Sequence, residues 1–234
     1  MKKVIFTFII NGYDTLKDPT IVTPGWDYLC YSDEGLSSEV WQSVRSNGLP
    51  VGVTCPKRRA SLLKIEHHKT LPEGYDLCIT LDGSMRINVN LDDFLGEFWT
   101  SGADMAIARH PHRNCVYDEG LEVLKHTLDD PQVVHDQLRR YEAAGYPRNQ
   151  GLYGTRMMVK EMHSQRLRRA CDRWSLEYRA GSRRDQLSLN YALWQEERAT
   201  ADPLRLQAFD FNEVYRVRKL FEIHRHLGTN RRWQ

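Results

Sequence analysis

The amino-acid sequence predicts an α/β fold in which a mixed, mostly parallel sheet is flanked by helices. Short apolar runs alternate with longer helical stretches, and polar residues directly follow several of the runs. The composition, 41% hydrophobic and 27% charged, is that of an ordinary globular protein. Because the sequence contains no repeat, linker or shift in composition, we expect one domain over residues 1–234 with a basic C-terminal tail at about 212–234.

The expected strands are short and rich in β-branched and aromatic residues, as in residues 4–10. The expected helices are longer, and Pro56 opens one of them while Gly145 ends another. We expect strands at residues 4–10, 26–33, 49–54, 77–82 and 103–109, a short strand or turn at 151–154, and helices at 57–69, 91–99, 117–127, 131–144, 156–174 and 184–197.

The stretch around Asp82 is the main functional signal. The apolar run 77–81 ends abruptly in Asp82-Gly83-Ser84, at the carboxyl end of a predicted strand. Ligands bind at that edge in open α/β sheets. A carboxylate there, beside a glycine that lets the backbone come close, suits a metal-bridged diphosphate. A polar turn is the alternative interpretation, and the tripeptide alone favours it.

Basic residues are concentrated in the helix predicted at 57–69, where Lys57, Lys64 and His68 lie near one face and Arg58 and Arg59 are in the first turn. Such cations can hold phosphates beside the free N–H groups of a helix start. An exposed basic helix is the alternative. The arginines of residues 156–184 and of the tail likewise form either solvated helix faces or surfaces for phosphates or an anionic polymer.

Residues 109–119 are dense in hydrogen-bonding side chains and follow a predicted strand, which places them at the same sheet edge as Asp82. His110 and Arg113 can hold an acceptor or donor sugar, and Glu119 can orient them. Zinc at His110 and His112 is disfavoured because no cysteine or third histidine has ligand spacing.

Two interpretations are open for Asp185. With Ser182 as the helix cap, Asp185 completes a capping-box arrangement. Alternatively, Asp185 lies at the helix N-terminus and points into the cleft, where it accepts a proton or a sugar hydroxyl. The field of the helix would lower its pKa and make it a weak base.

The tail contains His224-Arg225-His226-Leu227-Gly228, followed by further basic residues. A histidine, a glycine and basic side chains can fold over a diphosphate, with the imidazole on a metal ion and the cations on the oxygens. A disordered basic end is the alternative.

The five cysteines are odd in number and scattered, and they lack CxxC spacing, so we expect a reducing compartment and specifically the cytoplasm. The apolar run at residues 4–10 is short, and no small-residue cleavage site follows it, which argues against a signal peptide. No segment approaches the ~20 apolar residues of a membrane-spanning helix.

Four motifs occur in order: YLCYSDE at residues 28–34, LDGS at 81–84, RHPHRNCVYDE at 109–119 and RDQLS at 184–188. Together they resemble the glycosyltransferase-like family long described as a domain of unknown function, whose plant members act in mucilage and pectin synthesis. The resemblance covers about residues 4–195. It implies a GT-A-like (Rossmann-like) fold, a nucleotide-sugar donor such as a UDP-sugar, and a divalent cation, commonly Mn²⁺.

Most GT-A enzymes carry Asp-X-Asp at the strand end, whereas here Ser84 replaces the second acid. Asp82 is therefore the one strong ligand for Mn²⁺ or Mg²⁺, and His226 or His224 would complete the site. We predict Asp82 and His226 as metal ligands, Asp185, His110 and Arg113 as catalytic residues, and Phe8, Asn11, Tyr13, Asp33, Arg59, Lys64, Glu119, Arg184 and Gln186 as substrate-binding residues.

The predicted function is a glycosyltransferase that moves a sugar from a nucleotide-diphosphate sugar to a hydroxyl acceptor, by neutralising the leaving diphosphate and positioning the hydroxyl. A glycan acceptor follows from the resemblance, and the arginine-rich segments leave nucleic acid or a modified base open as acceptor. The missing second carboxylate suggests an alternative, a non-catalytic GT-A-like protein that binds a nucleotide sugar or nucleic acid.

Overall fold

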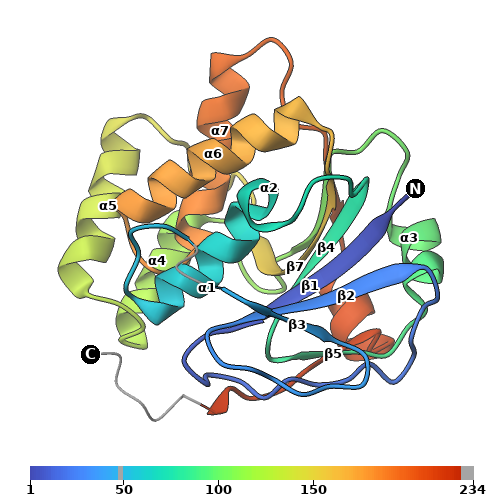
Figure 1. Cartoon of the computed structure of the whole chain (residues 1–234). Helices are drawn as coiled ribbons and strands as arrows, with labels where there is room; N and C mark the ends of the chain where they lie inside the picture. The colour runs from blue at the N-terminus through green and yellow to red at the C-terminus, as the bar shows by residue number, and fades with distance from the viewer. Residues whose placement is uncertain (47–49, 228–234) are drawn as a thin grey trace.

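A computed structural model describes residues 1–46 and 50–227, which fold around a seven-stranded sheet (Figure 1). The strand order is β3-β2-β1-β4-β7-β6-β8, and β7 runs antiparallel to both neighbours while the other neighbouring pairs are parallel. This arrangement confirms the predicted mixed, mostly parallel sheet. The strands are β1 (Lys3–Ile9), β2 (Trp26–Ser32), β3 (Gln42–Arg45), β4 (Leu77–Asp82), β6 (Met105–Arg109), β7 (Tyr153–Glu161) and β8 (Leu206–Phe209), and β5 (Met85–Ile87) pairs with β9 (Phe221–Ile223) in a separate small sheet.

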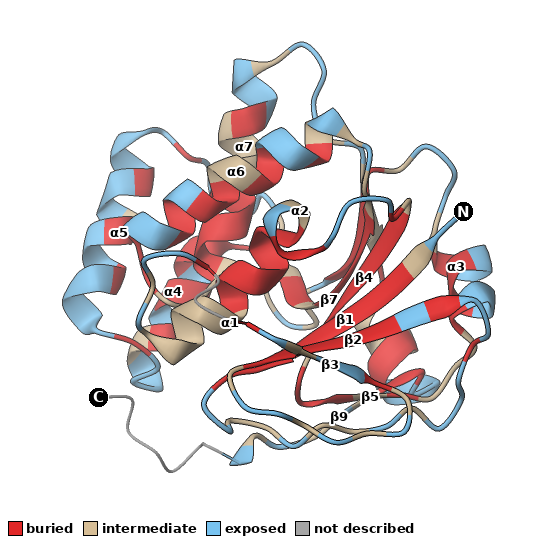
Figure 2. Cartoon of the chain, viewed as in Figure 1, coloured by how far each residue is buried: buried red, intermediate tan, exposed pale blue. Residues whose placement is uncertain are grey.

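Helices and the small sheet cover the two faces of the large sheet, and their buried sides face it (Figure 2). On one face α1, α6 and α7 pack on the strands, with Leu62 and Trp174 in the same core cluster as Met158. On the other face Phe94 of α3 and Phe221 of β9 share a core cluster with the sheet. The helices are α1 (Pro56–Ile65), α2 (His67–Thr70), α3 (Leu91–Phe98), α4 (Val116–Lys125), α5 (Pro131–Ala143), α6 (Gln165–Ala180) and α7 (Gln186–Ala199), with a π-helix, η1 (Glu213–Val217), before β9.

The third strand is β3, and the prediction of a strand at residues 49–54 is wrong. Leu49 lies outside the described residues, and residues 50–54 form turns and irregular chain. Pro50 has no N–H to donate to a ladder, and Gly52 has a φ of +75°. These two residues prevent the extended, paired backbone that the apolar composition suggested.

The predicted helix at residues 156–174 is wrong in its first part. Residues 153–161 form β7, and α6 begins only at Gln165. The run 157–159 is apolar and fully buried between β4 and β6, as expected of a strand covered on both faces. The charged residues Arg156 and Lys160 that flank this run hid the strand in the sequence.

The parallel strands bring residues that are distant in the sequence to one edge. β1, β2, β4 and β6 end at this edge, and the antiparallel β7 begins there. Phe8 of β1 lies in register with Asp82 of β4. The loops after β1, β4 and β6 therefore meet at the edge where the sequence placed the functional residues.

The segment at residues 213–223, within the predicted tail, is part of the fold. Val214 and Phe221 are fully buried in the core cluster that includes α3. Residues 228–234 of the tail lie outside the described residues. Within residues 1–46 and 50–227, no helix combines the length and the apolar character needed to cross a membrane.

Candidate functional site

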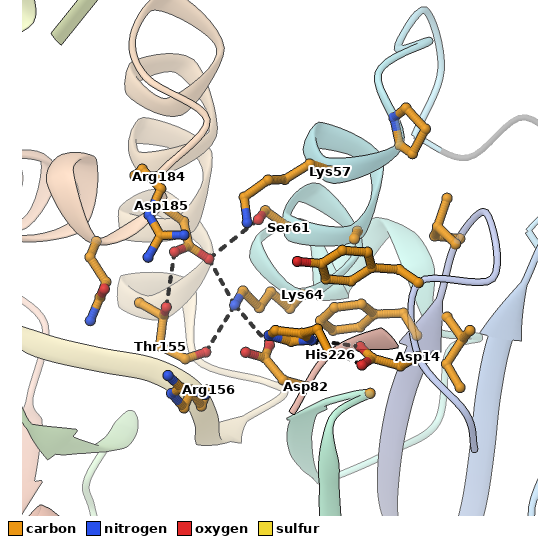
Figure 3. A pocket seen from close by; sticks show the side chains of 18 residues that line it. Asp14, Lys57, Ser61, Lys64, Asp82, Thr155, Arg156, Arg184, Asp185 and His226 are labelled. Carbon is orange, nitrogen blue, oxygen red and sulfur yellow. Dashed lines mark hydrogen bonds and ion pairs between the residues drawn. The ribbon is translucent and has the colours of Figure 1, made fainter. Parts of the chain in front are cut away.

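A cavity opens at the carboxyl edge of the sheet, bordered by the end of β1, one face of α1 and the starts of β7 and α7 (Figure 3). The lining side chains combine acids, cations and aromatic rings from segments that are far apart in the sequence. They include Phe8, Tyr13, Asp14, Lys57, Ser61, Lys64, Asp82, Thr155, Arg156, Arg184, Asp185, Gln186 and His226.

Lys64 is a buried cation held between two acids of this cavity. Its ammonium lies 2.7 Å from Asp185 Oδ2 and 3.0 Å from Asp82 Oδ1, and it donates to the carbonyl oxygen of Thr155 at 3.0 Å. The Lys64 side chain is only 4% exposed. Burial alone would lower the pKa of Lys64, but the two carboxylates raise it above its ordinary value. Lys64 is therefore a permanent positive charge.

Helix α1 turns one face to the cavity. Lys57, Ala60, Ser61 and Lys64 line it, at the spacing that aligns side chains along one side of a helix. Burial, together with the nearby guanidinium of Arg184, lowers the pKa of Lys57 to about 8. Lys57 is thus a second cation at the start of α1, and it loses its charge at a mildly alkaline pH.

Asp185 directs its carboxylate into the cavity instead of capping α7. Its Oδ1 accepts from Thr155 Oγ1 at 3.0 Å, and its Oδ2 pairs with Lys64. Burial would raise the pKa of Asp185, but Lys64 and neighbouring cations hold it below its ordinary value, so Asp185 is a weak base. The capping box is wrong, because the Ser182 hydroxyl donates to Asp129 and makes no cap for α7.

Gly83 lets the loop after β1 pack against the strand end that carries Asp82. A Cβ at position 83 would lie 2.8 Å from the Phe8 carbonyl oxygen and 3.4 Å from Asp14 Oδ2. Asp14 is in turn hydrogen-bonded to His226 Nδ1, at 2.9 and 3.1 Å from its two oxygens. Figure 3 shows the imidazole of His226 beside the carboxylate of Asp14, in the cavity that Asp82 also lines.

A second cavity adjoins the first, over the segment that follows β6. His110, Arg113 and Glu119 line it, as do Phe211 and Arg216. Glu119 is 5% exposed and accepts from Arg113 Nε at 2.6 Å, so a buried carboxylate orients the guanidinium as predicted. Burial, with Arg113 and other cations nearby, lowers the pKa of His110 to about 4 and keeps its imidazole neutral at pH 7.

Arg156, Arg184 and Gln186 line both cavities and mark the place where they meet. Gln186 donates to the carbonyl oxygen of Tyr153 at 3.2 Å, which fixes its side chain. Within the described parts of the chain, the guanidiniums of Arg156 and Arg184 form no ion pair. Two arginines that form no ion pair within the described residues favour an anionic ligand at this junction.

Three of the predicted substrate-binding residues, Asn11, Asp33 and Arg59, line neither cavity. The Asp33 carboxylate accepts from the Asn11 backbone N–H at 2.9 and 3.0 Å, and Arg59 Nη1 lies 3.7 Å from Asp33 Oδ2. These contacts fix the loop after β1 at the same sheet edge. Substrate contact at the three residues stays a prediction.

Most of the arginines between positions 156 and 184 form ion pairs with acidic residues of the fold. Such pairs compensate the charge that an open surface for nucleic acid would present to phosphates. The pairs are Arg166–Asp104, Arg169–Glu196, Arg173–Glu196, Arg179–Glu66 and Arg183–Asp129.

The residues predicted to hold a divalent cation, Asp82 and His226, line the same cavity. Lys64 occupies one carboxylate oxygen of Asp82, and Asp14 binds Nδ1 of His226, the arrangement by which a carboxylate orients a metal-binding histidine. No group of three or more acidic, histidine or cysteine side chains among the described residues is placed to hold a metal ion. Asp82 and His226 could therefore supply at most two ligands to a divalent cation. Substrate oxygens and water would supply the remaining ligands, as is common for Mg²⁺.

Three residues of the site were not among the predicted site residues. Asp14 follows β1, and the strand-end argument that selected Asp82 applies to it equally. Lys57 is found by the seven-residue spacing from Lys64 on α1. Arg156 had no signal of its own, because its segment was assigned to a helix.

The fold and the site together define an α/β protein with a cation-lined ligand cavity at the carboxyl ends of its parallel strands. Residues 31–226 match the family described as TOD1/MUCI70, glycosyltransferase-like domain, and the chain belongs to this family. It is thus a glycosyltransferase, as the sequence motifs predicted.

Among solved structures, the crystal structure of mouse xyloside xylosyltransferase 1 in its apo form is similar, with a TM-score of 0.47 and 10% sequence identity. The similarity covers 88% of this chain and 84% of the mouse chain. No curated protein matches the sequence.

Proposed function

We propose that this glycosyltransferase moves a sugar from a nucleotide-diphosphate sugar, with a UDP-sugar as the first choice, to a hydroxyl group of a glycan. The observation that carries the proposal is the junction of the two cavities at Arg156, Arg184 and Gln186. A donor in the first cavity and an acceptor in the second would meet there. Group transfer requires this proximity of the two reactants.

The donor diphosphate is assigned to the first cavity because that cavity contains the cations. Lys57 and Arg184 supply charge near the start of α1 and α7, and Arg156 supplies charge from β7. Phe8 and Tyr13 offer aromatic surface for the base. Negative charge that develops on the leaving diphosphate would be stabilised by these preorganised cations.

Asp82 and His226 would hold a divalent cation, Mn²⁺ or Mg²⁺, together with the donor. When bound, the cation neutralises the diphosphate as a Lewis acid. Lys64 holds the carboxylates of Asp82 and Asp185 in place through its two ion pairs. Asp185, at the end of the cavity next to Gln186, would accept a hydrogen bond from a sugar hydroxyl, a role that a weak base can fill.

The acceptor is assigned to the second cavity, where the buried pair Arg113–Glu119 and the neutral His110 present fixed hydrogen-bonding groups. A glycan is favoured over nucleic acid because five arginines of residues 166–183 are engaged in ion pairs. Binding to duplex DNA that weakens steeply with salt would favour nucleic acid instead. The cytoplasm remains the proposed compartment, supported by five cysteines that are all free.

The test is turnover of a panel of nucleotide sugars with Mn²⁺ and candidate glycans, followed by release of the nucleoside diphosphate. Asp82→Asn and Asp185→Asn should each lower turnover at least about a hundredfold, as loss of a group that acts on the reacting atoms does. Asp172→Asn, at a carboxylate that pairs with Lys69 away from both cavities, is the matched control. Unchanged turnover in both cavity variants would refute the assignment of the site.

A further inference from the structure

Asp14 and His226 form a contact between the loop after β1 and the segment after β9. The Asp14 carboxylate is 7% exposed, and both of its oxygens lie within 3.1 Å of His226 Nδ1. No other hydrogen bond reaches this carboxylate from the described residues. Burying a carboxylate costs solvation free energy unless the carboxylate is hydrogen-bonded. The hydrogen bond from His226 offsets this cost, and its loss would leave the Asp14 carboxylate buried without a partner among the described residues.

The imidazole is also fixed by stacking. The ring centroids of Tyr13 and His226 lie 4.7 Å apart, and the angle between the two ring planes is 29°. A hydrogen bond from Nδ1 to Asp14 leaves the lone pair on Nε2, the opposite side of the ring. Asp14 Oδ2 also lies where it would be 3.4 Å from a Cβ at position 83, the residue next to Asp82. The contacts with Asp14 and Tyr13 thus set both the tautomer of His226 and its position in the cavity that Asp82 also lines.

We propose that Asp14 is a positioning residue that directs His226 Nε2 toward the cation accompanying a nucleoside diphosphate in the first cavity. The inference depends on the proposed donor. It goes further by assigning Asp14 an indirect role, exerted through His226. Outer carboxylates of this kind raise metal affinity by about 10–100-fold when they orient a ligating histidine.

The experiment measures Mn²⁺ binding to the full chain by electron paramagnetic resonance, with and without UDP, and UDP binding without Mn²⁺ by calorimetry. Asp14→Ala should weaken Mn²⁺ binding in the presence of UDP by about 10–100-fold. Asp14→Asn, which keeps an oxygen acceptor, should retain part of the affinity. Asp18→Ala is the matched control, because Asp18 lies in the same loop and bonds Ser38 instead.

The double variant Asp14→Ala/His226→Ala tests whether Asp14 acts by positioning His226 or only by holding the loop after β1 against the segment after β9. If Asp14 acts through His226, the double variant binds Mn²⁺ as weakly as His226→Ala alone. If the contact only holds the two segments together, Asp14→Ala should lower the affinity for UDP without Mn²⁺ as much as it lowers the affinity for Mn²⁺. That result would overturn the inference.

Two further outcomes separate this inference from the proposed function. Wild-type protein that turns over a nucleotide sugar but binds Mn²⁺ no more tightly than Asp14→Ala would overturn the inference alone. Wild-type protein that binds no nucleoside diphosphate, with or without Mn²⁺, would overturn the proposed donor and the inference together.

Discussion

The Lys64 ammonium, 2.7 Å from Asp185 Oδ2, joins helix α1 to the start of helix α7 across the first cavity. The same ammonium reaches Asp82 at the end of β4. One buried cation thereby fixes two carboxylates that come from distant parts of the sequence, and the cavity depends on it for both shape and charge.

Lys64→Met should lower the free energy of unfolding by about 3–5 kcal/mol, because removing one partner of a buried ion pair leaves the other charge uncompensated. Urea unfolding measures the change. Lys69→Met is the matched control, since Lys69 is 53% exposed and its pair with Asp172 is worth less than about 1 kcal/mol. Equal losses in the two variants would show that the ammonium of Lys64 is not uniquely stabilising.

The Lys64–Asp185 pair predicts a defined dependence of stability on pH. Asp185 has a lowered pKa in the folded state, so its contribution is complete above its unfolded pKa of about 3.9 and is lost as the pH falls through the folded value. Lys64 has a raised pKa, so its contribution is complete below about pH 10.4 and is lost as the pH rises through the folded value.

Asp185→Asn isolates the acid side of this dependence. The difference in free energy of unfolding between wild type and variant should be constant from about pH 5 to 9 and shrink as the pH falls below about 4. Urea unfolding at a series of pH values measures it. A difference that persists undiminished at pH 2 would contradict the lowered pKa of Asp185.

Gly83→Ala should destabilise the protein by about 1–3 kcal/mol, because the added methyl group overlaps the Phe8 carbonyl oxygen and presses on Ile9. Thermal unfolding measures the change. Gly96→Ala is the control: Gly96 lies inside α3 with open space around it, and alanine there should stabilise by up to about 1 kcal/mol. The two substitutions should therefore shift the melting temperature in opposite directions.

Lys57 predicts the pH dependence of donor binding. With a pKa of about 8, Lys57 is mostly charged at pH 7 and mostly neutral at pH 9, so the affinity for UDP should fall about tenfold over this range. Lys57→Arg should flatten the dependence, because a guanidinium stays charged. Calorimetry at pH 7 and 9 provides the measurement, and an equally steep fall in the variant would assign the effect to another group.

Much of the fold follows from local patterns. Residues 4–10, 26–33 and 77–82 are short, apolar and β-branched, and they form β1, β2 and β4 within one or two residues. Helices α4 and α5 begin and end close to the predicted positions. Strand β7 was not predicted, because charged residues flank its apolar run of only three residues. Burial of such a charge depends on a partner elsewhere in the chain: Lys160 donates to the Lys64 carbonyl oxygen.

Some residues of the candidate site could likewise be predicted from local sequence, and others could not. Asp82, His110 and Arg113 were selected because they lie at or shortly after the ends of predicted strands, and a strand's carboxyl end is a local property of the sequence. Arg59 was selected over Lys57 as a phosphate ligand, although the cavity lies on the side of α1 that carries Lys57 and Lys64. Composition does not specify which face of a basic helix turns inward.

By itself the sequence determined the class of fold, the family, and the edge of the sheet at which the candidate site lies, because strand ends and motif order are written in consecutive residues. The tertiary structure alone decided that Lys64 lies between Asp82 and Asp185 and that His226 lies on Asp14. These pairs are separated by up to 212 positions. Their formation depends on how the sheet and its helices pack, since electrostatic attraction and exclusion of water act across space and not along the chain.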